Sequence, residues 1–293
     1  MNLIQPFTLN LNGRLYDVTV PQVMAIINIT DDSFYADSRA IDPKAIAGRA
    51  RELAADGADI LDLGACSTRP GSKPVDPDIE THRIVTAVKA VRDVLPDIPL
   101  SVDTFRASVA REAINAGADI INDISGGNFD PLMFPTIASL KAPYILTHTR
   151  GTPETMQSMT TYTDVAADVV RELSQKVEQL RLMGVCDIIV DPGLGFAKTV
   201  EQNYRLLDAI PQIAQLLECP VLIGASRKSM LTKPLGITAS QALNATTVVN
   251  TIALIHGAAF IRVHDPLQAR QAVTLVSMLP VNNRNKVYNL TNS

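Results

Sequence analysis

Residues 191–199 read Asp-Pro-Gly-Leu-Gly-Phe-Ala-Lys-Thr and follow the apolar run 188–190. Two glycines, a lysine and a threonine between a strand and a helix are features of a phosphate-binding loop. The P-loop, however, requires a glycine directly before its lysine, and here Ala197 stands in that place. The segment is therefore not a P-loop, and another ligand must explain it, or none.

Hydrogen-bonding side chains end each of the short apolar runs of the chain. In order they are Asn28, Asp62, Asp103, Asn122 with Asp123, His148, Asp191, Ser226, and Arg262 with His264. One such residue is often only a helix cap or a turn former, but a polar group at every run indicates a site. Buried carboxylates need donors, so Asp62, Asp103 and Asp191 predict a ligand rich in N–H groups.

Cationic residues of the same segments predict an anion beside that ligand. These cations are Arg69, Arg227, Lys228 and Arg262. One pocket would then hold a heterocycle with several donors next to a phosphate or a carboxylate. Asp123 is expected to serve the structure instead.

The elements that must position these residues alternate between two kinds. Short runs rich in Val, Ile and Leu predict strands at 23–28, 59–64, 100–103, 120–124, 144–148, 188–191, 221–226 and 260–264. Stretches with helical period lie between them, for example 44–56, 78–94, 106–116, 164–183 and 240–256. Apolar runs without alternation are buried on both faces, which indicates a parallel sheet. Eight strand–helix units in series predict a closed (β/α)8 TIM barrel, with a doubly wound open sheet as the competing fold.

The two ends of the chain differ from this pattern. Residues 7–19 alternate around Asn12-Gly13, which predicts an N-terminal β-hairpin. Residues 281–293 are polar and are expected to form a loose tail. We expect a single domain over residues 1–293.

Bulk properties exclude several classes of protein. The chain has 293 residues with a net charge of −4, and it contains no basic block that would indicate nucleic-acid binding. No run approaches the roughly 18 apolar residues of a membrane helix, and the N-terminus lacks a secretory signal pattern. Three cysteines without a CxxC pair fit reduced thiols in a cytoplasmic protein, and four scattered histidines predict no zinc site.

Seven segments together resemble one enzyme family, the dihydropteroate synthases, over about residues 20–280. They are 28–34 (NITDDSF), 67–72 (STRPGS), 101–104 (SVDT), 121–127 (INDISGG), 191–199 (DPGLGFAKT), 224–231 (GASRKSML) and 262–265 (RVHD). The resemblance implies condensation of a dihydropterin pyrophosphate with 4-aminobenzoate, assisted by Mg²⁺, in folate synthesis. The implied partners are these small molecules, with neither nucleic acid nor membrane, and a homodimer is expected because the family is commonly dimeric.

The resemblance also implies roles for individual residues. Asp103, Asn122, Asp191 and Lys228 would contact the pterin. Asn28, Thr68, Arg69, Arg262 and His264 would bind the pyrophosphate, with Asn28 also on the Mg²⁺. Thr68, Arg69, Pro70, Phe196, Lys228 and Ser229 would form the aminobenzoate site. Asp103, Lys228, Arg262 and His264 would support catalysis, Arg227 would brace loops, and Lys198 would be a solvated charge at the rim.

Some residues depart from the pattern of the family. Asp32 replaces a usual proline, Ala65 and Cys66 replace a usual Gly-Glu pair, and Thr147 and Thr149 replace apolar residues around the histidine. None of these changes removes a proposed polar contact. The alternatives are a pterin-binding methyltransferase domain, a degenerate pterin-binding paralogue that would have lost Lys228, Arg262 or His264, and a barrel with unrelated chemistry.

Overall fold

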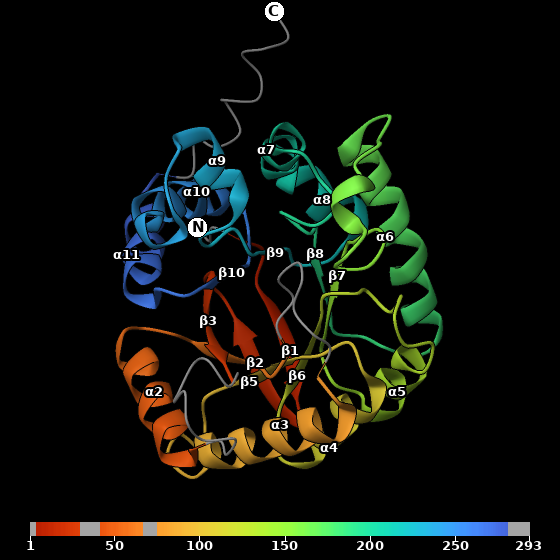
Figure 1. Cartoon of the computed structure of the whole chain (residues 1–293), viewed down its shortest axis with the longest axis vertical. Coiled ribbons are helices and arrows are strands. Elements are labelled where there is room, and N and C mark those ends of the chain that lie inside the picture. The colour runs from red at the N-terminus through yellow and green to blue at the C-terminus, as the bar shows by residue number, and fades with distance from the viewer. Residues whose placement is uncertain (1–3, 30–41, 67–74, 281–293) are drawn as a thin grey trace, which may run out of the picture.

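A computed structural model describes residues 4–29, 42–66 and 75–280. Within these ranges eight parallel strands form one sheet, surrounded by a ring of helices (Figure 1). The strands of the sheet are β3 Gln22–Asn28, β4 Ile60–Gly64, β5 Leu100–Asp103, β6 Ile120–Asp123, β7 Tyr144–Thr147, β8 Ile188–Asp191, β9 Leu222–Ile223 and β10 Phe260–Val263. They pair in the order β8-β7-β6-β5-β4-β3-β10-β9, and a bridge between Val190 and Val221 joins the two edges. The predicted barrel is confirmed, and the open sheet is excluded.

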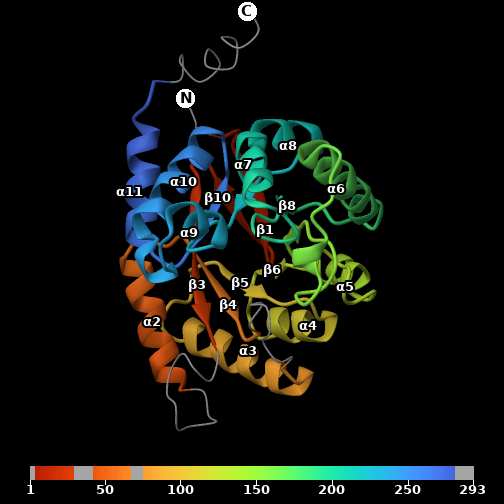
Figure 2. The same ribbon diagram turned by 45° about the horizontal axis from the view of Figure 1, so that its top comes forward.

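Helices follow the strands and cover the outside of the barrel. They are α2 Pro43–Ala55, α3 Pro77–Arg92, α4 Ala107–Asn115, α5 Met133–Leu140, α6 Val165–Leu182, α7 Val200–Asp208, α8 Ile210–Leu217, α9 Ser229–Leu235, α10 Leu243–Ile255 and α11 Pro266–Ser277. Figure 2 shows α10 and α11 beside β10, where Leu254, Ile261 and Val273 share one buried apolar cluster. None of the helices in these ranges is long and apolar enough to cross a membrane.

The strand boundaries agree with the sequence pattern except at 221–226. There the structure has a strand of only two residues, Leu222 and Ile223. The chain leaves the sheet early because Ala225 accepts a backbone hydrogen bond from Lys228, which begins the turn into α9. Residues 224–226 therefore belong to the turn that leads into α9 rather than to the strand.

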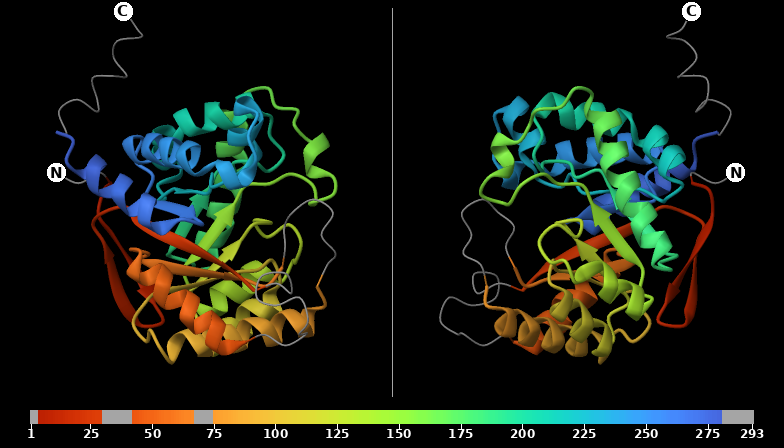
Figure 3. Two further views of the ribbon diagram at one scale, coloured as in Figure 1. Left: turned by 60° about the vertical axis from the view of Figure 1, so that its left-hand side comes forward. Right: turned by 90° about the vertical axis from the view of Figure 1, so that its right-hand side faces the viewer.

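The predicted hairpin closes the N-terminal end of the barrel. Its strands, β1 Phe7–Leu11 and β2 Arg14–Val18, are joined by Asn12 and Gly13, which both have positive φ, as a type I′ turn requires. The ring centroids of Phe7 and Phe260 lie 5.9 Å apart. Leu9 and Leu11 join a buried cluster with one residue from the start of nearly every barrel strand: Met24, Ile60, Ile120, Ile145, Ile189, Leu222 and Phe260. Figure 3 shows the hairpin, in red, at the end of the barrel opposite the loop between β7 and α6.

The buried cluster under the hairpin also shows which side chains face the inside of the barrel. Side chains alternate along a strand, so the residue two positions after each cluster member faces the inside one layer higher. That rule places Asp62, Asn122, Thr147, Asp191 and Arg262 inside the barrel, at the carboxyl ends of the strands. Catalytic and binding residues of TIM barrels come from this end.

Candidate active site

A shared arginine holds two carboxylates inside the barrel. The Arg262 side chain donates from Nε to Asp62 Oδ2 at 2.6 Å and from Nη2 to Asp103 Oδ2 at 2.7 Å. Asn122 Nδ2 donates to the same Asp62 oxygen at 3.1 Å. Four strands thus bring together residues far apart in the chain. Asp62 was predicted to bind a ligand, but it accepts hydrogen bonds from Arg262 and Asn122 of the protein itself.

One guanidinium cannot fully neutralise two carboxylates. Burial raises the pKa of Asp103 to about 7, and the charge of Arg262 opposes this rise while that of Asp62 adds to it. Asp103 is therefore poorly satisfied in its ionised form. A ligand that brings N–H donors or positive charge would stabilise the carboxylate.

Asp191 and Lys228 form the second half of the site. Asp191 is buried at the end of β8, and its Oδ1 accepts a hydrogen bond from the Gly193 N–H at 2.7 Å. Burial raises the pKa of Asp191, with Lys228 as the strongest opposing charge. Lys228 donates to the Leu194 carbonyl at 2.6 Å, its Nζ lies 4.6 Å from the Phe196 ring centre, and burial lowers its pKa to about 8. The sequence-predicted residues Asp191, Phe196 and Lys228 therefore lie together.

Several oxygens inside the barrel lack a hydrogen-bond partner among the described residues. They are Asp62 Oδ1, Ser101 Oγ and Thr147 Oγ1. Thr147 is the neighbour of Asp191 in the strand register. These atoms add polar groups to the wall of the lumen, where most buried polar groups are hydrogen-bonded. The threonine that departs from the family pattern therefore adds a polar group to this wall.

The loops after β9 and β10 are tied together at the barrel mouth. Arg227 donates from Nε and Nη2 to the two oxygens of Asp265, at 3.1 and 2.7 Å, which confirms its bracing role. Ser226 Oγ and His264 Nδ1 are 2.9 Å apart. Ser229 is exposed in the first turn of α9. Its predicted contact with a carboxylate, like that of His264 with phosphate, stays a prediction.

Asp123 serves the structure, as the sequence predicted. Its carboxylate accepts hydrogen bonds from Tyr144 Oη at 2.6 Å and from the backbone N–H groups of Ser125 and Gly127 at 2.7 and 2.8 Å. Both oxygens are thereby used within the protein. This side chain joins β6, β7 and the turn after β6.

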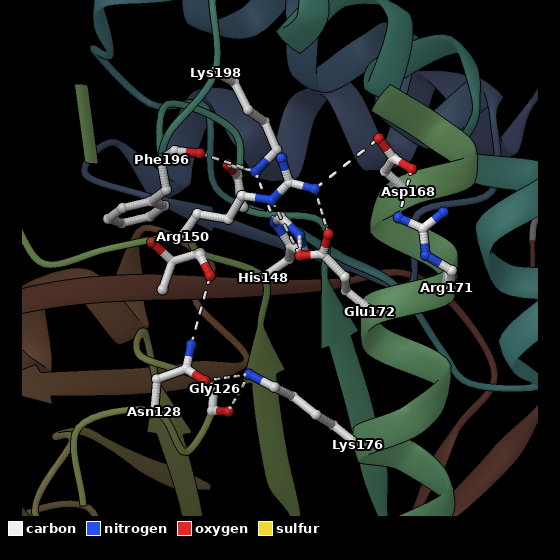
Figure 4. Close-up of polar contacts among 12 residues, drawn as sticks. Gly126, Asn128, His148, Arg150, Asp168, Arg171, Glu172, Lys176, Phe196 and Lys198 are labelled. Atoms are coloured by element: carbon white, nitrogen blue, oxygen red, sulfur yellow. Dashed lines mark hydrogen bonds and ion pairs between the residues drawn. The ribbon is translucent and has the colours of Figure 1, made fainter. Parts of the chain in front are cut away.

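The expectation that Lys198 is a solvated rim charge is wrong. Its side chain is buried, and Nζ donates to His148 Nδ1 at 3.0 Å, to the Gly193 carbonyl at 3.0 Å and to the Phe196 carbonyl at 2.9 Å (Figure 4). Gly193 and Gly195 have positive φ, which folds the loop back so that its carbonyls surround the ammonium group. Burial lowers the pKa of Lys198 to about 7, against the opposing charge of Asp191.

The acidic partner of His148 was not predicted from the sequence. His148 Nε2 lies 3.0 Å from Glu172 Oε2, and Arg150 pairs with the same carboxylate. Burial lowers the pKa of His148 to about 4, and the hydrogen bond from His148 holds that of Glu172 at about 2. Glu172 belongs to α6, which carries many other polar residues, so nothing in the sequence distinguishes it as the partner of His148. Glu172 and Arg150 line a cavity of about 480 Å³.

Three predicted residues cannot be placed, because Thr68, Arg69 and Pro70 lie outside the described residues. Asn28, the predicted metal ligand, is exposed at the end of β3. The described ranges contain no group of three or more His, Cys, Asp or Glu side chains that could hold a metal ion. A single amide oxygen fits a hard cation that takes most of its ligands from a substrate and from water.

The fold and the site together define a TIM-barrel protein whose carboxylates, amide and cations gather at the carboxyl ends of its strands. Comparison with known proteins agrees with this class. The family described as pterin binding enzyme matches residues 24–264. A dihydropteroate synthase from Synechocystis is 42% identical over 246 residues, which are 83% of this chain and 84% of that protein.

Solved structures of dihydropteroate synthases are also similar to this chain. Dihydropteroate synthase from Xanthomonas albilineans, solved with 4-aminobenzoic acid, superposes with a TM-score of 0.86 at 32% identity, covering 94% of this chain and 100% of the other. The same enzyme solved with 7,8-dihydropteroate gives a TM-score of 0.82 at 30% identity and the same coverage. The chain belongs to the pterin-binding enzyme family and, within it, to the dihydropteroate synthases.

Proposed function

We propose that the protein condenses 6-hydroxymethyl-7,8-dihydropterin pyrophosphate with 4-aminobenzoate to give 7,8-dihydropteroate and pyrophosphate. This makes it a transferase of folate synthesis. The observation that carries the proposal is the meeting of Asp103, Asn122, Asp191 and Lys228 at the carboxyl ends of the strands, in a member of this family. Carboxylate and amide oxygens there suit the N–H groups of an aminopyrimidine ring.

The buried charges fit a reaction that passes through a cation. The bond between the exocyclic methylene of the dihydropterin and the pyrophosphate oxygen breaks, and the pyrophosphate leaves with the electron pair. Asp103 stabilises the positive pterin, while Arg262 and His264 stabilise the leaving group. The neutral amine of 4-aminobenzoate then attacks the methylene and loses a proton to solvent. No strong base is required, because positioning and electrostatics supply the catalysis.

The aminobenzoate would lie between Phe196 and the segment 68–70, with its carboxylate toward Ser229. Lys228, near Phe196, would contact both substrates. This arrangement rests on the family resemblance for Thr68, Arg69 and Pro70. The homodimer likewise stays a prediction.

Mg²⁺ is proposed as the assisting ion, with Asn28 as its ligand from the protein. Its chemistry would be to offset the charge of the departing pyrophosphate. The donors that the described residues offer near this strand end do not make a complete coordination sphere, which agrees with an ion that arrives with its substrate.

We therefore expect Mg²⁺ to bind only when pyrophosphate is present. Calorimetric titration of the empty protein with Mg²⁺ should give no saturable heat, and the same titration after addition of pyrophosphate should. Asn28→Ala is the matched variant and should weaken only the second titration. Tight Mg²⁺ binding to the empty protein would contradict this assignment.

Pterin affinity should fall on acidification. Asp103 and Asp191 both have raised pKa values, so each becomes protonated at higher pH than an ordinary aspartate and then offers an O–H where the pterin also donates. For a pKa of about 7, the ionised fraction of Asp103 drops roughly eightfold between about pH 7.5 and about pH 6, and the affinity should drop by a similar factor.

The probe for this measurement is 6-hydroxymethyl-7,8-dihydropterin, which has no phosphate to titrate in the same range. Asp103→Asn should reduce the pH dependence of its Kd, leaving only the contribution of Asp191. Equal Kd values at the two pH values in the wild-type protein would show that neither carboxylate titrates there.

An assay of pyrophosphate release tests the function as a whole. The expected result is release that depends on 4-aminobenzoate and yields dihydropteroate in equal amount. Release without 4-aminobenzoate, or none at all, would count against the synthase. The methyltransferase alternative has no support in the relatives and structures described above.

A further inference from the structure

The Lys198 ammonium group has as many acceptors as it has protons. Its three N–H bonds meet His148 Nδ1 and the carbonyls of Gly193 and Phe196, all at 2.9–3.0 Å. The side chain is only 6% exposed. All three acceptors are neutral groups, so the hydrogen bonds of this side chain do not involve a carboxylate.

These contacts fix the protons of the neighbouring groups. In its ammonium form Lys198 can only donate, so His148 then accepts at Nδ1 and carries its proton on Nε2. That N–H then donates to Glu172 Oε2, 3.0 Å away. Arg150 holds Glu172 as a carboxylate through an ion pair. A directed hydrogen-bond chain therefore runs from α6 to Lys198 (Figure 4).

Lys198 fixes the loop that orients Asp191. The Gly193 carbonyl accepts from Lys198, and the Gly193 N–H donates to Asp191 Oδ1 at 2.7 Å. A Cβ on Gly193 would lie 1.9 Å from the His148 carbonyl oxygen, so the loop is pressed against the end of β7. Among the described residues, no hydrogen bond uses Asp191 Oδ2. The carboxylate is thus clamped at one oxygen, with the other left for a ligand.

We propose that Lys198 is a positioning residue for pterin binding, which acts by fixing the loop 193–196 and through it the orientation of Asp191. This inference rests on the proposed function, because the pterin is the ligand that Asp191 would bind. Lys198 does not contact the substrate. Its partners His148 and Glu172 anchor it to α6, so that helix shares in shaping the pocket.

Lys176 provides a matched control on the same helix as Glu172. It is a half-buried lysine that also donates to a loop, with Nζ 2.7 Å from the Gly126 carbonyl and 2.8 Å from Asn128 Oδ1. Figure 4 shows it pointing to the loop after β6, away from Phe196 and Lys198. Removing its ammonium group perturbs a loop contact without reaching Asp191.

The test measures the Kd of 6-hydroxymethyl-7,8-dihydropterin by calorimetry and the KM and kcat of the full reaction. Lys198→Met should raise the pterin Kd and KM about tenfold or more, whereas Lys176→Met should stay within about twofold of wild type. Glu172→Gln, at the far end of the chain, should raise the Kd by a smaller factor. It also serves as the second variant if Lys198→Met does not fold.

A double-mutant cycle separates positioning from a general lesion. If Lys198 acts through Asp191, Lys198→Met combined with Asp191→Asn should bind pterin no more weakly than Asp191→Asn alone, since effects on one group are not additive. Additive losses, an unchanged Kd in Lys198→Met, or an equal loss in Lys176→Met would each overturn the proposal. A wild-type protein that binds no pterin would instead refute the proposed function, so the two failures are distinct.

Discussion

Asp191→Asn is expected to weaken pterin binding by about 3 kcal/mol, roughly a hundredfold in Kd. The asparagine Oδ1 can still accept from the Gly193 N–H, as Asp191 Oδ1 does at 2.7 Å. Its amide NH₂ would then point into the pocket, where the pterin also donates. The change replaces a charge-assisted acceptor with a donor that meets donors. Calorimetric titration with 6-hydroxymethyl-7,8-dihydropterin measures the effect.

Asp123→Asn is the control for this substitution. Asp123 is as deeply buried, but its acceptors are used by Tyr144, Ser125 and Gly127. We expect it to lower the free energy of unfolding while leaving the pterin Kd of the folded protein near the wild-type value. If Asp191→Asn bound pterin as well as wild type, Asp191 could not be the pterin-binding carboxylate.

Arg262→Met is expected to lower the free energy of unfolding by about 3–5 kcal/mol at neutral pH. The change leaves Asp62 and Asp103 inside the barrel without the guanidinium that pairs with both. Removing one partner of a buried ion pair is costly because the remaining charge is uncompensated. Turnover should be lost as well. Urea unfolding at about pH 8 measures the stability.

Acid should restore much of the stability of this variant. Burial already raises the pKa of Asp103 to about 7, and loss of Arg262 removes the main opposing charge. A carboxyl whose folded pKa exceeds its unfolded pKa stabilises the protein below the unfolded value, and this contribution is lost as the pH rises through the folded value. The stability of Arg262→Met should therefore fall between about pH 5 and pH 8.

The control is Arg270→Met, which breaks a pair with Asp59 outside the barrel lumen. That pair is partly exposed, with side chains 28% and 26% accessible. Its loss should be smaller and similar at both pH values. A deficit in Arg262→Met that does not change between pH 5 and pH 8 would mean that no buried carboxylate is left uncompensated.

The sequence predicted the barrel because each strand is a distinct apolar run ending in a polar residue. Their position at the ends of these runs marked Asp103, Asn122 and Asp191 as site candidates, since the carboxyl ends of parallel strands meet, and the family resemblance gave them their pterin role. The pairing of Arg262 with Asp62 joins residues 200 positions apart, and only the closed barrel brings them together. The strand predicted at 221–226 was too long, because residue types alone do not show where a strand ends and the following loop begins.

Lys198 shows a different limit of sequence reasoning. A lysine after a glycine-rich turn normally extends into water, and nothing nearby in the chain supplies a side-chain partner. Its partner His148 lies 50 positions away, and His148 in turn requires Glu172 on α6. A buried lysine whose acceptors are two carbonyls and an imidazole has no signature in residue type or spacing.

The hairpin at the base of the barrel has a consequence for how the chain folds. Phe7, near the start of the chain, packs against Phe260 of the last strand, and β3 pairs with β10. Such contacts give the chain a high contact order, which slows folding. On a ribosome the hairpin would emerge early and wait, with its apolar face unpaired, until some 250 further residues had been made. The segment that seals the finished barrel is thus the one that waits longest for the residues it packs against.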